Sequence, residues 1–249
     1  MIVVLGDGVP GDASHALARG LRQLGEEVVL GARVTDGPEA DDIVAIRCAM
    51  SSGHEVAEFL ARVEAAAHPV HAVVLVSTGV TAPAPGELAA LDADQWEEGV
   101  EAPLQRTLAC FQGSYRRLRG RGGCLVVLVP TMALVGAAGG APWAAVAEAQ
   151  RAMAKSAGRS WGHEGITVNC LAVPASLLAA APSAEDTATS GGSGGGTGLD
   201  RPGLPPPSLE RSPTMDTEVA PVVASLAARA WAGVTGATIA VDGGIWMTP

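Results

Sequence analysis

The chain has 249 residues, of which 48% are hydrophobic and 17% charged, so it can bury a sizeable core within one α/β domain. Its formal net charge of −10 repels nucleic acid and anionic membrane surfaces, and neither is expected as a partner. No stretch approaches the roughly 20 apolar residues that span a bilayer, and the start of the sequence lacks a basic leader. These features predict a soluble, cytoplasmic protein.

Short, β-rich apolar runs alternate with segments of helical periodicity along the chain. Runs such as Val73–Val76 are apolar at every position, which suits strands that are covered on both faces of a parallel sheet. The pattern predicts a single doubly wound (Rossmann) α/β domain with a seven-stranded parallel sheet. In chain order, the expected strands are Ile2–Asp7, Glu27–Arg33, Asp42–Cys48, Ala72–Ser77, Gly123–Val129, Thr167–Val173 and Thr238–Val241.

One segment breaks the alternation. Residues Ala179–Pro213 are rich in Ala, Ser, Gly and Pro and lack the apolar periodicity needed to order themselves, which predicts a flexible low-complexity insertion. A final helix, expected at Glu218–Trp231, and a strand still follow, so the segment is an insertion within one domain and no domain boundary.

The four cysteines show no spacing typical of metal or redox sites. Each lies in an apolar run, so we expect four buried, reduced thiols and no metal site. They are Cys48, Cys110, Cys124 and Cys170.

Two segments resemble motifs of the short-chain dehydrogenase/reductase family. Gly165–Pro174 is similar to its "GITVN-x-x-x-P-G" strand, and Thr235–Gly244 is similar to the "TG-x-x-x-x-VDGG" ending of the 3-oxoacyl carrier-protein reductases. The resemblance covers nearly the whole chain outside Ala179–Pro213, which stands where the family has its substrate lid. It implies acyl or polyketide-like substrates and NADPH as cofactor, and it allows the family's functional positions to be located by counting.

The family's phosphate-binding turn, "T-G-x-x-x-G-I-G", falls on Asp7–Ser14, where only Gly8 matches in register. Asp12 places a carboxylate where phosphate charge would sit, and Ser14 adds a side chain where close helix packing favours glycine. Two alternatives remain open. A displaced turn could use Gly8 and Gly11 with the preceding glycine, or Asp12 and Ser14 could simply cap the following helix.

Three further positions bear on the cofactor. Arg33, at the end of the second strand, matches the arginine that binds the 2′-phosphate of NADP in many members, although a merely solvated arginine is the alternative. Cys48 stands where the family has an aspartate that holds the adenine. Val76–Gly79 stands where it has "N-N-A-G", so that Gly79 is the retained glycine. The departures weaken the case for a bound cofactor.

The catalytic tetrad is replaced throughout. Counting from Ile166 places the tyrosine position on Trp143 and the lysine position on Ala147, and neither side chain can transfer a proton or carry a charge. The serine position falls on Pro130, with Thr131 as the adjacent hydroxyl, and the asparagine position falls on Pro103. The only tyrosine, Tyr115, and the only lysine, Lys155, are both expected away from this cleft.

These replacements favour a catalytically degenerate family member that acts as a non-catalytic subunit or small-molecule-binding scaffold and needs no cofactor. We expect a homo-oligomer, or a heteromer with an active reductase homologue, paired through helices at about Asp94–Arg119 and Pro142–Gly162. The second helix is dense in alanine, which lets a partner helix approach closely, and Pro103 should kink the first. The alternatives are a non-redox enzyme, such as a dehydratase, cyclase or isomerase, and an atypical NADPH-dependent ketoreductase.

Overall fold

A parallel seven-stranded sheet lies at the centre of the protein, with strand order β3-β2-β1-β4-β5-β6-β7. This confirms the predicted doubly wound domain. In the computed structural model, the described residues are 1–7, 12–33, 43, 45–76, 88–136, 139–178 and 207–247. The strands are β1 (Ile2–Gly6), β2 (Val28–Ala32), β3 (Ala45–Arg47), β4 (Ala72–Val76), β5 (Gly123–Pro130), β6 (Ile166–Val173) and β7 (Thr238–Ala240).

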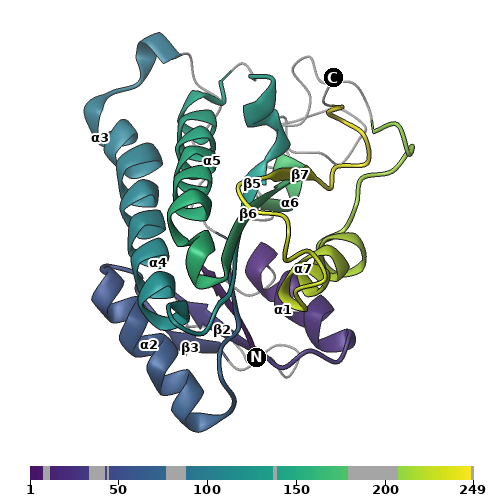
Figure 1. Ribbon diagram of the computed structural model, residues 1–249. Coiled ribbons are helices and arrows are strands. Elements are labelled where there is room, and N and C mark those ends of the chain that lie inside the picture. Colours follow the sequence, from purple (N-terminus) through teal and green to yellow (C-terminus); the bar gives the residue numbers. More distant parts are fainter. Residues whose placement is uncertain are drawn as a thin grey trace.

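Helices cover both faces of the sheet, as Figure 1 shows. On one face lie α2 (Gly53–Ala66), α4 (Ala102–Leu118) and α5 (Ala141–Trp161). The other face carries α1 (Ala13–Gln23), α7 (Ala220–Ala227) and the short α6 (Ala175–Leu178).

Strand β1 shows why the central strands are apolar at every position. Val3 and Leu5 belong to the core beneath α2, α4 and α5, whereas Ile2 and Val4 belong to the core beneath α1 and α7. Successive side chains of a strand point to opposite faces, so a strand covered on both faces must be apolar throughout. Edge strand β3 is exposed along its length and covers Ala45–Arg47, ending one residue before the predicted Asp42–Cys48, whose first residue lies outside the described residues.

The first expected interface helix is interrupted. In place of one helix over Asp94–Arg119, α3 (Ala93–Trp96) leads into a π-helical turn, η2 (Glu97–Glu101), and then into α4. Pro103 stands in the first turn of α4, directly after η2, and it has no N–H to donate to the carbonyls of that turn. The disturbance expected from this proline therefore takes the form of a π-helical turn just before it.

The final helix also differs from its prediction. It begins with a π-helical turn, η7 (Met215–Val219), and α7 ends at Ala227, not at Trp231. Arg229, just beyond the end, has a φ of 61°, a left-handed conformation that does not continue a helix. By contrast, α5 agrees with the prediction to within one residue at each end.

Most of the predicted insertion lies outside the described residues. Its last part is described, and there the backbone N–H of Leu209 donates to the carbonyl of Gly243 at 3.1 Å. This part of the chain therefore contacts the C-terminal segment. Within the described ranges, no helix is long and apolar enough to cross a membrane.

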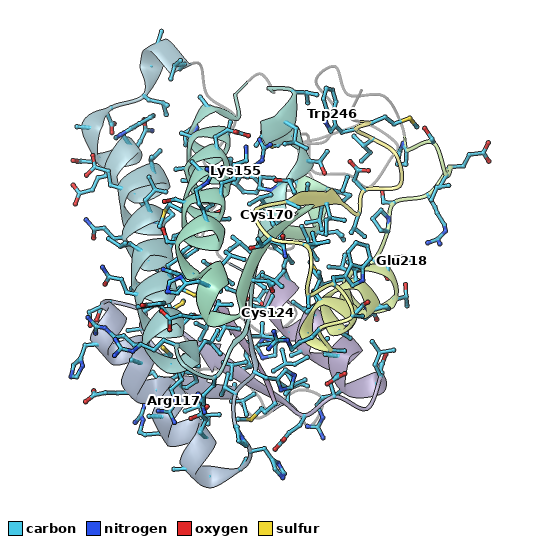
Figure 2. The ribbon with its side chains drawn as sticks, in the orientation of Figure 1. Arg117, Cys124, Lys155, Cys170, Glu218 and Trp246 are labelled. Carbon is cyan, nitrogen blue, oxygen red and sulfur yellow. The ribbon has the colours of Figure 1, made fainter. Side chains whose placement is uncertain are left out.

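All four cysteines are buried and free, which confirms that expectation. Figure 2 shows Cys124 and Cys170 within the sheet, between the helix layers. Burial raises the pKa of the Cys48 thiol to about 11 and those of the other three to about 12. The thiols are therefore protonated at neutral pH.

Helices α2 and α4 pack closely against each other at Gly113. A Cβ added there would lie 2.5 Å from the Cβ of Val56, which no real contact shows. Glu64 of α2 also pairs with Arg121, just beyond α4, at 2.9 Å. The glycine therefore sets the spacing of the two helices.

We expect Gly113→Leu to lower the free energy of unfolding by about 1–3 kcal/mol, because the side chain would force the two helices apart. Urea unfolding followed by tryptophan fluorescence measures the change. A control is Gly162→Ala, since nothing lies within 4 Å of the added Cβ and the residue has a helical φ of −59°. Equal unfolding midpoints for Gly113→Leu and the wild type would contradict the expected clash.

Candidate functional site

The first turn of α1 is capped by its own carboxylate. Asp12 is the N-cap residue, and its Oδ1 accepts hydrogen bonds from the backbone N–H groups of Ser14 at 2.8 Å and His15 at 3.0 Å. The hydroxyl of Ser14 also donates to this oxygen, at 2.6 Å. The capping alternative is therefore confirmed, whereas Gly8 and Gly11 lie outside the described residues.

The pKa of Asp12 reflects this arrangement. Burial alone would raise it, but the hydrogen bonds from His15 and Ser14 outweigh that effect and hold the pKa below its usual range. The carboxylate is thus charged at neutral pH. It occupies the helix N-terminus, the place where a helix commonly binds a phosphate group.

Arg33 forms an ion pair at the carboxyl end of the sheet. It follows β2, and its Nε donates to Oδ1 of Asp7, at the end of β1, at 2.7 Å. Only 26% of the Arg33 side chain and 13% of the Asp7 side chain are exposed. Burial raises the pKa of Asp7, and the guanidinium of Arg33 opposes that rise. The sequence interpretations did not identify this carboxylate partner, and the 2′-phosphate role of Arg33 stays a prediction.

A second arginine, which the sequence did not indicate, joins this pair. Arg106 of α4 lies within electrostatic range of Arg33 and Asp7, and burial lowers the pKa of its guanidinium. Its Nε is buried and has no hydrogen-bond partner among the described residues. At the carboxyl ends of β1 and β2, Arg33 pairs with Asp7, and Arg106 interacts with both groups electrostatically. No local pattern in the sequence points to Arg106, because its approach depends on how α4 packs over the sheet.

The remaining cofactor positions add no polar group. Cys48 is 1% exposed, and its backbone N–H donates to the carbonyl of Ala32 at 2.8 Å. Its protonated thiol is no equivalent of an aspartate that accepts hydrogen bonds. Gly79 lies outside the described residues.

The two positions expected to hold tyrosine and lysine are buried in α5. Trp143 is 5% exposed and Ala147 is 1% exposed. Pro130 ends β5, and Thr131 opens the 3₁₀ turn η3 (Thr131–Leu134), which packs against α5. Neither Nε1 of Trp143 nor Oγ1 of Thr131 has a hydrogen-bond partner among the described residues. Both atoms are therefore buried polar groups left unsatisfied.

A buried chain of hydrogen bonds passes through the asparagine position. The amide Nε2 of Gln150 donates to Oγ1 of Thr107 at 2.9 Å, and that hydroxyl donates to the carbonyl of Pro103 at 2.9 Å. Gln150 and Thr107 are 1% and 0% exposed. The chain joins α5 to α4, and sequence reasoning missed it because it depends on how the two helices face each other.

Tyr115 and Lys155 are engaged elsewhere. The Tyr115 hydroxyl donates to Oε1 of Glu164 at 2.8 Å, and its ring stacks on Trp161, at the C-terminal end of α5. Lys155 lies two turns beyond Ala147 and lines a different pocket. In the described part of the chain, no group of three or more His, Cys, Asp or Glu residues could hold a metal ion.

Comparison with known proteins agrees with this architecture. A family model described as enoyl-(acyl carrier protein) reductase matches residues 14–246. A solved structure of a mutant Serratia marcescens short-chain dehydrogenase/reductase is similar, with a TM-score of 0.69 and 18% sequence identity. The similarity covers 98% of this chain and 96% of that one. Among curated proteins, none matches this sequence.

Proposed function

The chain belongs to the short-chain dehydrogenase/reductase family, and from that membership we propose that it is a non-catalytic member, retained as a subunit or small-molecule-binding scaffold. One observation carries the proposal: Trp143 and Ala147 fill the tyrosine and lysine positions, and both are buried in α5. An indole does not titrate in water and a methyl group has no charge, so the proton donor and its activating cation are both missing. The description of the matching family supports a setting in acyl metabolism.

The described residues do not fit NADP(H). Asp12 presents a carboxylate at the helix N-terminus that would face the pyrophosphate, and its Oδ1 already accepts the N–H groups there. Arg33 is held by Asp7 and would have to leave this carboxylate to meet a 2′-phosphate. Ala147 offers no ammonium to hold the ribose. We therefore derive no step through this cofactor.

A second candidate function uses the same cleft for a small molecule, either bound or transformed without redox chemistry. It is favoured by the unsatisfied Nε1 of Trp143 and Oγ1 of Thr131, because buried polar atoms in native proteins nearly always have partners. Both can donate a hydrogen bond to a carbonyl oxygen. An acyl or polyketide-like carbonyl compound would match that chemistry.

A family member that transfers no hydride can still act by binding another subunit, and we infer that this protein does so. Helices α4 and α5 lie side by side on one face of the molecule (Figure 1). Ala145, Ala149 and Ala152 share one side of α5, and Ala152 is exposed, as is 49% of Leu108 on α4. A surface of methyl groups and leucine lets a partner helix approach the backbone over an apolar face.

We expect the protein to form dimers through this surface, and Ala152→Glu to weaken them by about a hundredfold, because a carboxylate would be buried against the partner. Size-exclusion chromatography with light scattering over a concentration series measures the dissociation constant. Ala65→Glu introduces the same charge on an exposed position of α2 and should leave the dimer unchanged.

The partner can be a second copy or an active reductase homologue. Co-expression with family members from neighbouring genes, followed by the same measurement, distinguishes the two, since a heteromer would replace the homodimer. A strict monomer that gains no partner under either condition would contradict the association. The small-molecule function would then become the better account.

A further inference from the structure

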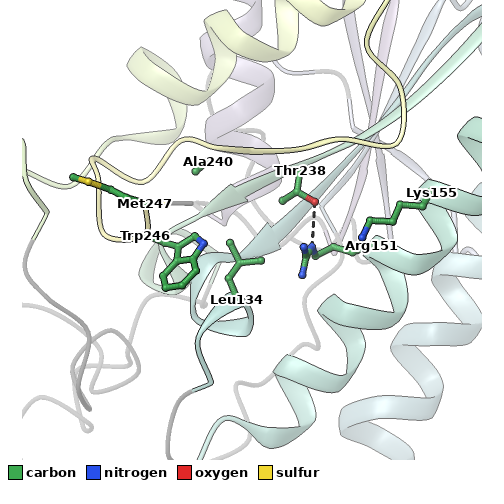
Figure 3. Close-up of a pocket in the computed structure, with 7 residues that line it drawn as sticks. All are labelled: Leu134, Arg151, Lys155, Thr238, Ala240, Trp246 and Met247. Atoms are coloured by element: carbon green, nitrogen blue, oxygen red, sulfur yellow. Dashed lines mark hydrogen bonds between the residues drawn. The ribbon is translucent and has the colours of Figure 1, made fainter. Parts of the chain in front are cut away.

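A pocket separate from the tetrad positions lies between α5 and the edge strand β7. Its volume is about 630 Å³, within the range of small-molecule sites, and Figure 3 shows its walls. Helix α5, strand β7, the turn η3 and the C-terminal segment all contribute to it. Its lining residues are Leu134, Arg151, Lys155, Thr238, Ala240, Trp246 and Met247.

One side of this pocket is positively charged. Arg151 and Lys155 lie one turn apart on α5, and Figure 3 shows their side chains next to each other. Nε of Arg151 donates to Oγ1 of Thr238 at 3.1 Å, and its Nη1 pairs with Glu148. Across the described residues, no ion pair includes Lys155. The Glu148 carboxylate therefore neutralises only one of the two neighbouring cations, Arg151 and Lys155. Such an excess of positive charge in a chain of net charge −10 favours an anion.

The other side is apolar and is held in place by the C-terminal motif. Asp242 is 2% exposed and accepts the backbone N–H groups of Gly244 at 2.9 Å and Trp246 at 3.0 Å. These bonds fix the turn that brings the indole of Trp246 beside Leu134 (Figure 3). The "VDGG" sequence thus has a local structural role here, which is to shape this wall.

We propose that the pocket binds a small organic carboxylate with a flat, apolar body. The carboxylate would lie between Arg151 and Lys155, where Thr238 already holds the guanidinium in a fixed orientation. The apolar body would pack on Trp246 and Leu134, as ligand bodies pack on aromatic walls in sites with few polar groups. The site uses the side of α5 that faces β7, so it does not depend on the function proposed for the tetrad positions.

Naphthoate is a suitable probe because it joins one carboxylate to a flat aromatic body. Isothermal titration calorimetry should give a dissociation constant below about 1 mM for the wild-type protein. Naphthalenemethanol, which has the same body without the charge, should bind at least about tenfold more weakly. Lys155→Gln and Arg151→Gln should each weaken naphthoate binding by about tenfold or more.

Arg159→Gln is the matched control, since Arg159 is an exposed cation on the same helix and does not line the pocket. It should leave naphthoate binding unchanged. Thermal melting identifies any variant that fails to fold, and Lys155→Gln keeps the test decisive if Arg151→Gln disturbs β7. The proposal is overturned if the dissociation constant of naphthoate exceeds about 1 mM, if the neutral alcohol binds equally well, or if Arg159→Gln weakens binding as much as Lys155→Gln.

Discussion

Purified protein is expected to oxidise neither NADPH nor NADH when acetoacetyl thioesters or simple ketones are supplied. The expectation rests on the proposal that Trp143 and Ala147, both buried in α5, stand in place of the proton donor and its activating cation. Losing such a pair removes several powers of ten in rate. The absorbance of the reduced nicotinamide measures turnover, with an active reductase of the family assayed in parallel.

Turnover near about 1 per second, an ordinary value for an enzyme, would contradict this expectation. Trp143→Phe then serves as a matched test, because it keeps the aromatic ring and removes the indole N–H. Activity that is present in the wild type and lost in this variant would show that the indole takes part in the reaction.

We also expect NADPH and NADH to bind with dissociation constants no lower than about 1 mM, because the Asp12 carboxylate opposes the pyrophosphate at the N-terminus of α1. Asp12→Asn removes the charge and keeps a side-chain oxygen that can cap the helix, so it should tighten NADPH binding by about tenfold. Asp12→Gly should act in the same direction. Calorimetry measures both.

The control for this second expectation is Asp94→Asn, which removes the same charge from an exposed position on α3. It should leave NADPH binding unchanged. A micromolar dissociation constant in the wild type, or identical binding by Asp12→Asn and the wild type, would show that the pyrophosphate does not approach this helix end.

Strands covered on both faces were the most predictable part of the fold. The sequence located β1, β4 and β5 to within one residue. A short unbroken apolar run is typical of a strand that helices cover on both faces. Edge strand β7 agrees equally well, and β3 ends one residue before the predicted Cys48, because the end of an edge strand depends on its single neighbour more than on the local pattern. The π-helical turn η2 carries no sequence signal beyond the proline that follows it.

Positions in the candidate site could be predicted from their spacing along the family's motifs. Contacts between residues that are distant in sequence could not. Counting placed Asp12 at the start of the first helix, and the structure has it there as the N-cap residue. The contact between Arg33 and Asp7 joins the ends of two strands that are distant in sequence. The approach of Arg106 depends likewise on how α4 packs over the sheet, so single-sequence reasoning could not find it.

The burial of every cysteine makes this protein a convenient subject for site-specific labelling. The thiolate is the reactive form, and thiols with pKa values of about 11 to 12 in a closed core react with reagents only when the structure opens. In the dissociated monomer, a cysteine introduced at the exposed position of Ala152 would therefore be the one fast-reacting thiol. A photo-crosslinker attached there could capture whatever covers α5, while slow labelling of the native cysteines would report how often the sheet opens.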